Sequence, residues 1–326
     1  MSAISVSLKI PRLGREIFDR LWKTNHALTR LGFASLGLLV LTVVLASLDL
    51  RVINGTPAWV KPIKFAVSST FYTFTLVWML SYVRGQGRLV RLVGNASALA
   101  LSVELVLIVL QVARGVRSHF NFSTPLDGAI YSTMAVFILV VWALNLVAAI
   151  LLLRQPLADR PFAWSLRLGL LIALIGSGVG ALMTQPTPSQ LAGLQAGRGS
   201  TIIGAHSVGV EDGGPGLPFL GWSTQGGDLR VAHFFGLHAL QVIPLTGFAA
   251  NKYYRKRMNE KRRMMLVWTI GLGYLGLVLL LIWQALRGQP IIAPDRLTLA
   301  AFGALLIGGA GAFSLIASGK SKTRSE

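Results

Sequence analysis

The residues best suited to carry chemistry are four of the five histidines and one glutamate. His119 and His233 lie at the ends of apolar segments, and His238 lies deeper in the same segment as His233. His206 lies in a long connection on the same predicted side of the membrane, and Glu104 lies inside an apolar run. Imidazole rings and carboxylates transfer protons near neutral pH and ligate haem iron or divalent metals. An ionisable side chain within a membrane is costly and usually functional, so Glu104 is predicted to have a role.

Depth along the helices predicts a partner for Glu104. This residue lies ~15 Å below Arg114 at 1.5 Å per residue, and His238 lies ~12 Å below Arg230 by the same rise. If their helices are neighbours, Glu104 and His238 could share a proton, ligate a metal or hold one histidine tautomer. A second possibility is a hydrogen-bonded structural pair.

Helical geometry separates His233 from His238. Five residues turn the second side chain ~140° from the first, so one metal ion is not expected to bind both. Ligands from different segments, such as His119 with His233, are favoured instead. His119 and His233 could also be interfacial anchors, and His206 a solvated loop residue.

These considerations give a set of candidate residues. Catalytic roles are predicted for Glu104 and His238, and cofactor binding for His119, His233 and His238. Because the sequence has no Cys, any metal or cofactor must be held by His, carboxylate or Met side chains. A metal site is predicted from His119, His206 and His233, and the cofactor could be haem b or a divalent metal. The expected substrate-binding residues are Lys61, Lys64, Arg114, Arg230, His206 and Trp222.

The elements that position these residues are predicted to be transmembrane helices. Hydrophobic residues make up 53% of the chain and charged residues only 13%, which excludes an ordinary soluble domain. About eight apolar stretches reach the roughly 20 residues that cross a bilayer. They are residues 31–48, 65–83, 92–113, 127–153, 164–184, 231–250, 265–286 and 297–318. We therefore expect an all-α, polytopic transmembrane helix bundle.

Basic residues predict the orientation. They concentrate in the amphipathic N-terminal segment 1–27, in the connections 84–91, 154–160 and 252–263, and in the tail 319–326. An even number of spans places all of these segments on one side, so both termini are predicted to be cytoplasmic, in a bacterial cytoplasmic (inner) membrane. The net charge of +19 is then matched by anionic lipid headgroups at the cytoplasmic face of the bilayer, and no nucleic-acid partner is expected.

The transmembrane domain 28–318 contains a long glycine-rich connection, residues 185–230, on the extracytoplasmic side. Loops of this length are usually functional or disordered, and its interspersed Trp, Phe and Leu residues predict an ordered cap. Glycine clusters around Gly176, Gly271 and Gly308 predict close helix packing rather than nucleotide binding, because they lie inside apolar spans.

One part of the sequence resembles a known family. The runs GWST at 221–224, GDLRVAHF at 227–234 and GLHALQ at 236–241, together with WVKPIKF at 59–65, resemble a family of bacterial multi-pass membrane proteins. No activity or cofactor is established for that family, so the resemblance implies none. The span count also resembles haem A synthases, but their paired histidines have no counterpart in the first two or last two spans.

Three functions are consistent with this pattern. The leading expectation is a membrane-embedded enzyme or redox protein with a His/Glu site under the cap. The alternatives are a proton-coupled transporter, in which Glu104 exchanges a proton and cationic residues attract an anion, and a non-catalytic scaffold or assembly factor whose cap binds a partner.

Overall fold

The structure is a bundle of long apolar helices, as the sequence predicts. The computed structural model describes residues 10–318, so the predicted basic tail 319–326 and residues 1–9 lie outside the described part. Within residues 10–318, eight helices are long and apolar enough to cross a membrane. They are α2 (His26–Leu48), α3 (Val60–Leu80), α4 (Gly87–Ala113), α5 (Pro125–Arg154), α6 (Arg160–Met183), α8 (Leu229–Tyr254), α9 (Glu260–Leu286) and α10 (Arg296–Ser318).

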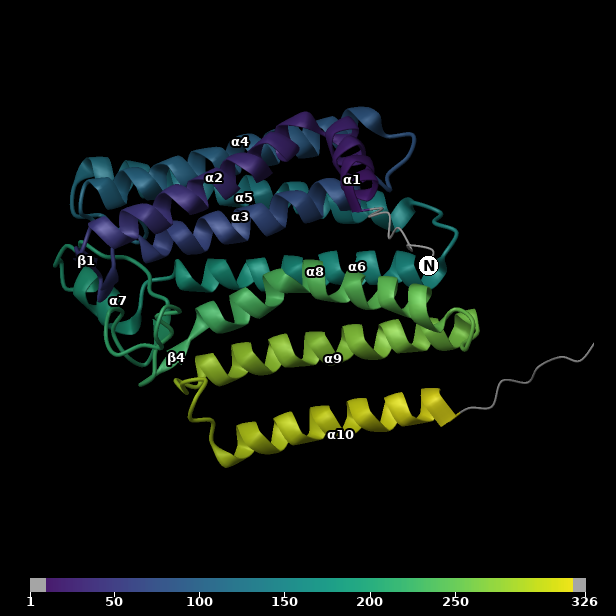
Figure 1. Ribbon diagram of the computed structural model, residues 1–326. Helices are drawn as coiled ribbons and strands as arrows, with labels where there is room; N and C mark the ends of the chain where they lie inside the picture. Colours follow the sequence, from purple (N-terminus) through teal and green to yellow (C-terminus); the bar gives the residue numbers. More distant parts are fainter. Residues whose placement is uncertain (1–9, 319–326) are drawn as a thin grey trace, which may run out of the picture.

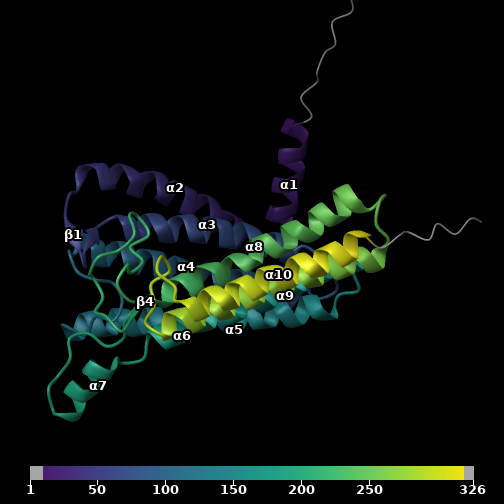
Figure 2. The ribbon, with the colours of Figure 1, turned by 90° about the horizontal axis from the view of Figure 1, so that it is seen from below.

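The two ends of the bundle differ. At the left end in Figure 1 lie α7 (Pro188–Gln195) and the short strands β1 (Val52–Ile53), β2 (Thr56–Pro57), β3 (Ser207–Val208) and β4 (Gly227–Asp228). We call this the cap end. The opposite end, with α1 (Ile10–Thr24), the α8–α9 connection and the end of α10, is called the basic end. In Figures 1 and 2, α1 lies roughly perpendicular to the long helices, and Figure 2 shows it projecting away from the bundle.

The long helices form two groups, visible as upper and lower layers in Figure 1. In the first half, α2 packs on α3 and α4 packs on α5. In the second half, α6, α8 and α9 pack against one another, and α10 packs against α9. The halves meet where α5 contacts α6 and, more sparsely, where α3 contacts α8. This boundary is called the seam below.

Polar N-caps explain where several helices begin. The side chains of Thr124, Asp159 and Asn259 each accept a hydrogen bond from a backbone N–H in the first turn of α5, α6 and α9. Pro125 and Pro161 occupy first-turn positions, where the missing N–H leaves no helical hydrogen bond unmade. The N-caps and prolines therefore determine where these helices begin, while the apolar runs determine which segments span the membrane.

Glycines bring α6 and α8 into close contact. A Cβ added to Gly176 would lie 2.3 Å from the Cα of Gly236, so a larger residue at either position would force the helices apart. Gly271 and Gly276 of α9 also face neighbouring side chains, as predicted. The packing prediction was wrong for Gly308 of α10, around which the described residues leave open space.

The cap, residues 185–230, folds back onto the helices. Strand β3 pairs with β4 immediately before α8, and the buried Trp222 packs in a cluster with Val231 and Leu281. The β1–β2 hairpin lies beside the cap, because a Cβ on Gly55 would lie 2.5 Å from the carbonyl oxygen of Gly213. The cap thus covers one end of the bundle.

Candidate functional site

Glu104 is a buried carboxylate without hydrogen-bond partners. It lies on the packed face of α4, and its residue is only 2% exposed. Neither carboxyl oxygen makes a hydrogen bond within the described chain. The nearest basic group is the His119 ring, with Nε2 3.4 Å from Oε1 of Glu104. Buried carboxylates normally have several hydrogen-bond donors, so this one is a strong candidate for function.

His119 connects Glu104 to a lysine. It lies in the connection between α4 and α5, and its Nδ1 is 3.0 Å from Nζ of Lys61 on α3. Burial lowers the pKa of His119, and the charge of Lys61 lowers this pKa further, while Glu104 opposes both effects. The ring is therefore neutral near pH 7. Lys61 then donates to Nδ1, and the remaining ring proton on Nε2 faces Glu104.

We call Lys61, His119 and Glu104 the relay chain. Its members come from α3, the α4–α5 connection and α4, all in the first half of the protein. The rings of Phe65 and Tyr131 surround His119, with centroids 5.9 and 6.1 Å from it. These apolar neighbours limit access by water and strengthen the interactions within the chain.

The basic residues around the relay chain differ in their partners. Lys64 donates a 3.0 Å hydrogen bond to the backbone oxygen of Leu220 in the cap. Neither Lys61 nor Lys64 forms an ion pair with a carboxylate in residues 10–318. Arg230, in contrast, is paired with Asp228, its Nε lying 2.9 Å from Oδ1. Two lysines are thus left without an anionic partner beside the cap.

His206 forms a separate pair inside the cap. Its Nδ1 is 2.7 Å from Oδ2 of Asp212, whose carboxylate also accepts from the backbone N–H groups of His206 and Ser207. Burial lowers the pKa of His206 to about 4, although Asp212 acts in the opposite direction. Burial would raise the pKa of Asp212, but the hydrogen bonds from His206 and Ser207 hold it well below its usual range. A neutral ring that donates to a carboxylate is the expected state at neutral pH.

His233 and His238 lie on α8 and are not joined to Glu104. Nδ1 of His233 is 2.8 Å from the carbonyl oxygen of Gly176, which fixes that ring against α6. Nδ1 of His238 is 3.2 Å from Oε1 of Gln241, whose amide donates to Thr75 across the seam. Helical depth predicted His238 as the partner of Glu104, but the structure brings His119 to Glu104 instead, from the connection that follows α4.

The predicted metal ligands are not brought together. His119 contacts Lys61 and Glu104, His206 contacts Asp212, and His233 contacts a backbone carbonyl. Over the described part of the chain, no group of three or more His, Asp or Glu residues is arranged to hold one metal ion. A metal bound jointly by His119, His206 and His233 would therefore require a different arrangement.

Two predicted substrate residues are engaged in packing. Arg114 binds the buried Asp127, with Nη1 2.7 Å from Oδ1, and also contacts Gln111. The indole of Trp222 stacks edge-on against Phe234 at 5.6 Å. Both residues stabilise the cap end, and neither contacts the relay chain.

Buried polar residues of α3 and α5 were not recognised from the sequence. Tyr72 donates a 2.9 Å hydrogen bond to Asn145, which is 8% exposed within the membrane-spanning part of α5. The signal was present, because Asn145 is a polar residue inside an apolar run, where such residues usually have partners.

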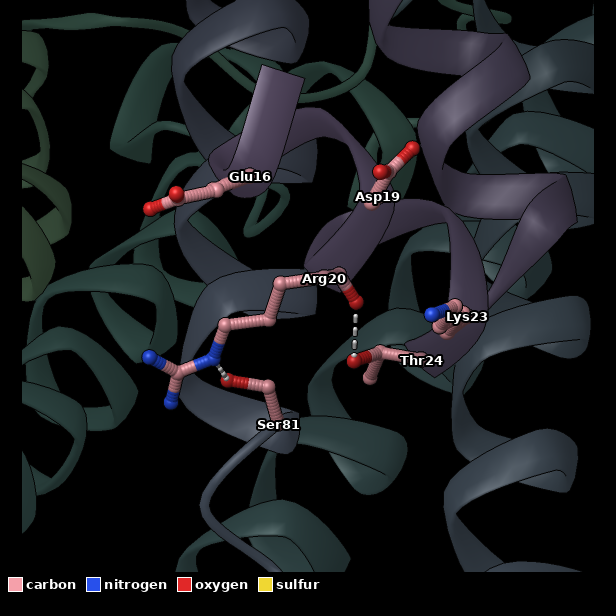
Figure 3. Close-up of a pocket in the computed structure, with 6 residues that line it drawn as sticks. All are labelled: Glu16, Asp19, Arg20, Lys23, Thr24 and Ser81. Atoms are coloured by element: carbon pink, nitrogen blue, oxygen red, sulfur yellow. Dashed lines mark hydrogen bonds between the residues drawn. The ribbon is translucent and has the colours of Figure 1, made fainter. Parts of the chain in front are cut away.

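A surface pocket of about 500 Å³, drawn in Figure 3, lies at the basic end between α1 and the end of α3. Its wall includes Arg20, whose Nε donates a 2.9 Å hydrogen bond to Ser81 at the end of α3. The lining residues are Glu16, Asp19, Arg20, Lys23, Thr24 and Ser81. The pocket shares no residue with the relay chain.

The fold and these contacts define a class: a multi-pass, α-helical integral membrane protein. Comparison with protein-family models, curated proteins and solved structures gives no match to the chain. The function must therefore be argued from the site itself.

Proposed function

We propose that the protein is a proton-coupled carrier of a small anion, with Glu104 as the proton acceptor. The observation that carries this proposal is the buried carboxylate of Glu104, without hydrogen bonds and adjacent to His119. A carboxylate held in this way gains from protonation, because the neutral acid is much less costly to bury.

The relay chain supplies the proton from the cap end. The Lys61 ammonium transfers a proton to Nδ1 of His119 while Nε2–H of His119 passes its proton to Glu104. Lys61 loses its positive charge and Glu104 loses its negative charge in the same step. To reset the chain, the His119 ring proton must return from Nδ1 to Nε2, by a turn of the ring or through water, and Lys61 must take a new proton from water at the cap end.

The two lysines support an anionic substrate. Lys61 and Lys64 lie one helical turn apart at the start of α3 and lack ion-pair partners in the described chain. A carboxylate or phosphate group would supply the missing charge. Because Lys64 also donates to Leu220, an anion bound to the two lysines would be linked to the cap through Lys64, and this link would couple binding to movement at the seam.

The orientation is part of this proposal. We propose that the cap end faces the extracytoplasmic side of a bacterial cytoplasmic membrane and that both termini are cytoplasmic. The basic connections at the other end support it. So does α1, whose direction roughly perpendicular to the long helices is that of a helix lying in the headgroup layer.

Transport by proteoliposomes tests the function. Purified protein is reconstituted with an acidic exterior, and uptake of radiolabelled acetate, succinate and phosphate is measured. We expect the pH gradient to drive accumulation of at least one of these anions. The Glu104→Gln variant should lower this accumulation about a hundredfold, because the proton acceptor is lost.

Glu211→Gln is the matched control, since Glu211 is an exposed cap residue. It should transport like the wild type. Full gradient-driven uptake by Glu104→Gln, or no accumulation of any of the three anions by the wild type, would contradict the proposal.

A second candidate function is a haem- or metal-dependent membrane enzyme or redox protein. One observation favours it: in residues 10–318 the rings of His206 and His233 hydrogen-bond through Nδ1 alone, which leaves Nε2 for a ligand. Absorbance spectra and metal analysis of the purified protein test it. A Soret band or stoichiometric metal that disappears in His233→Ala would support this function over transport.

A further inference from the structure

Buried polar side chains continue below Glu104 toward the basic end. Ser97 lies on the same face of α4 as Glu104, two turns lower, and is completely buried. Its hydroxyl has no hydrogen-bond partner in the described chain and lies beside the phenol of Tyr72. Tyr72 in turn donates to Asn145, so α3, α4 and α5 each contribute one polar group to the same level.

The series of buried polar side chains extends to the basic end of the bundle. Asn25, the N-cap of α2, is 4% exposed and donates a 3.0 Å hydrogen bond to Asn95 of α4. A Cβ on Gly94 would lie within 2.4 Å of the Asn25 side chain, so α2 and α4 are in close contact here. Gly94 is one turn below Ser97, and this places the asparagine pair directly beneath the Tyr72 level.

In a network that serves only stability, each buried polar group is expected to have a hydrogen-bond partner. Buried hydroxyls and carboxylates that pack for stability are nearly always hydrogen-bonded. Here Ser97 and Glu104, successive polar residues on one helix face, both lack partners in the described residues. The ~10 Å between them along α4 corresponds to roughly three hydrogen-bonded water molecules.

We propose that Ser97, Tyr72 and Asn145 form the basic-end half of a proton path, through which Glu104 exchanges protons with the cytoplasm. This inference rests on the proposed function of Glu104 as a proton acceptor and adds the route by which the proton leaves. In this path the hydroxyls of Ser97 and Tyr72, joined to Glu104 through water, accept a proton on one side and release one on the other. The amide oxygen of Asn145 accepts from Tyr72 and orients its hydroxyl. The asparagine pair Asn25–Asn95 leads to the aqueous phase.

The two sides of Glu104 are chemically different. His119 and Lys61 are the titratable groups that face it from the cap side, and the charge of Glu104 also acts on Lys61. On the basic-end side the corresponding groups are hydroxyls and amides. Access from the two sides can therefore be altered independently.

The test measures protonation of Glu104 from each side. The protein is inserted in one orientation into liposomes, and the pH is changed rapidly on one side only. The readout is the infrared carbonyl band of a protonated carboxyl group, which is assigned to Glu104 by its loss in Glu104→Gln. No substrate is needed.

We expect the wild-type band to respond to a pH change on either side. Tyr72→Phe and Ser97→Ala should slow the response to the basic-end change about a hundredfold and leave the cap-end response unchanged. His119→Gln should give the opposite pattern. Tyr274→Phe is the matched control, because the Tyr274 hydroxyl is also bonded within the membrane, to Phe235 of the second half. This variant should respond like the wild type.

Three outcomes would overturn the proposed proton path. A wild-type band that follows only the cap-end pH overturns this inference and leaves the proposed function intact, as does a normal basic-end response in both Tyr72→Phe and Ser97→Ala. Ser97→Ala removes a single hydroxyl, so a folding defect confined to Tyr72→Phe does not decide the result. A band that persists in Glu104→Gln overturns the inference and the proposed function together.

Discussion

His119 is the residue on which the relay chain depends, because both of its ring nitrogens are engaged. Lys61 occupies Nδ1 and Glu104 faces Nε2, so the ring must remain neutral to accept from one and donate to the other. Burial provides this condition by lowering its pKa. Ser118 also approaches Nδ1, at 3.1 Å, and helps to hold the ring in place.

His206 gives a prediction about pH. Its pKa falls from 6.5 in the unfolded chain to about 4 in the folded protein, so the unfolded chain binds the additional proton. The contribution of the neutral ring to stability is complete above pH 6.5 and is lost as the pH falls toward 4. The thermal unfolding midpoint of the purified protein should therefore decrease by roughly 5 °C across this interval.

The His206→Gln variant should show a smaller decrease over the same interval, because it removes the proton-binding difference. His26→Gln, at the basic end, is the control and should behave like the wild type. An equal decrease in all three proteins would exclude His206 as the source.

At the residue scale, the sequence singled out Glu104 and His119 as candidates but did not predict the contact between them. Glu104 and His119 were both selected, the first for its place in an apolar run and the second for its position near a span end. Their pairing depends on the backbone of the connection 114–124, which turns His119 back toward α4. Hydropathy and helical depth carry no information about such a turn.

At the scale of elements, the contact between α6 and α8 is the most sensitive. Gly176→Ala should destabilise the protein by about 1–3 kcal/mol, because the added Cβ meets the backbone at Gly236. Thermal unfolding in detergent measures this change. Gly178→Ala is the matched control on the same helix, since nothing lies within 4 Å of the added Cβ. Equal midpoints for the two variants would contradict the packing argument.

The spans could be predicted from composition, and their beginnings could not. Apolar runs located all eight helices, because a membrane leaves few alternatives to a helix. The structure starts α3 at Val60 rather than residue 65, and α8 at Leu229 after the Asp228 cap. These first turns are polar and belong to the cap end. Gly308 shows a related limit, since a glycine cluster does not reveal whether a partner helix is present.

At the scale of the molecule, the candidate site lies where the two halves and the cap meet. Lys61 belongs to the first half, while Lys64 reaches Leu220 in the cap. Only sparse contacts join α3 to α8, and one of them is the hydrogen bond from Gln241 to Thr75. A boundary of this kind is suited to relative movement of the halves.

The proposed orientation can be tested with single cysteines, because the sequence contains no Cys. Arg198 in the cap and Lys256 in the α8–α9 connection are both exposed. In intact cells, a membrane-impermeant maleimide should label Arg198→Cys and not Lys256→Cys. Permeabilised cells should show labelling of both. The reverse pattern in intact cells would invert the topology.

The division into halves also sets an order of assembly during synthesis. Lys61, His119 and Glu104 all precede residue 154, the last residue of α5, so the ribosome completes the relay chain before any of the second half exists. The cap, which Lys64 contacts through Leu220, and α8 are made later. A nascent chain that stalls between α5 and α8 would therefore already hold all three residues of the relay chain, while Lys64 would still lack its hydrogen-bond acceptor in the cap.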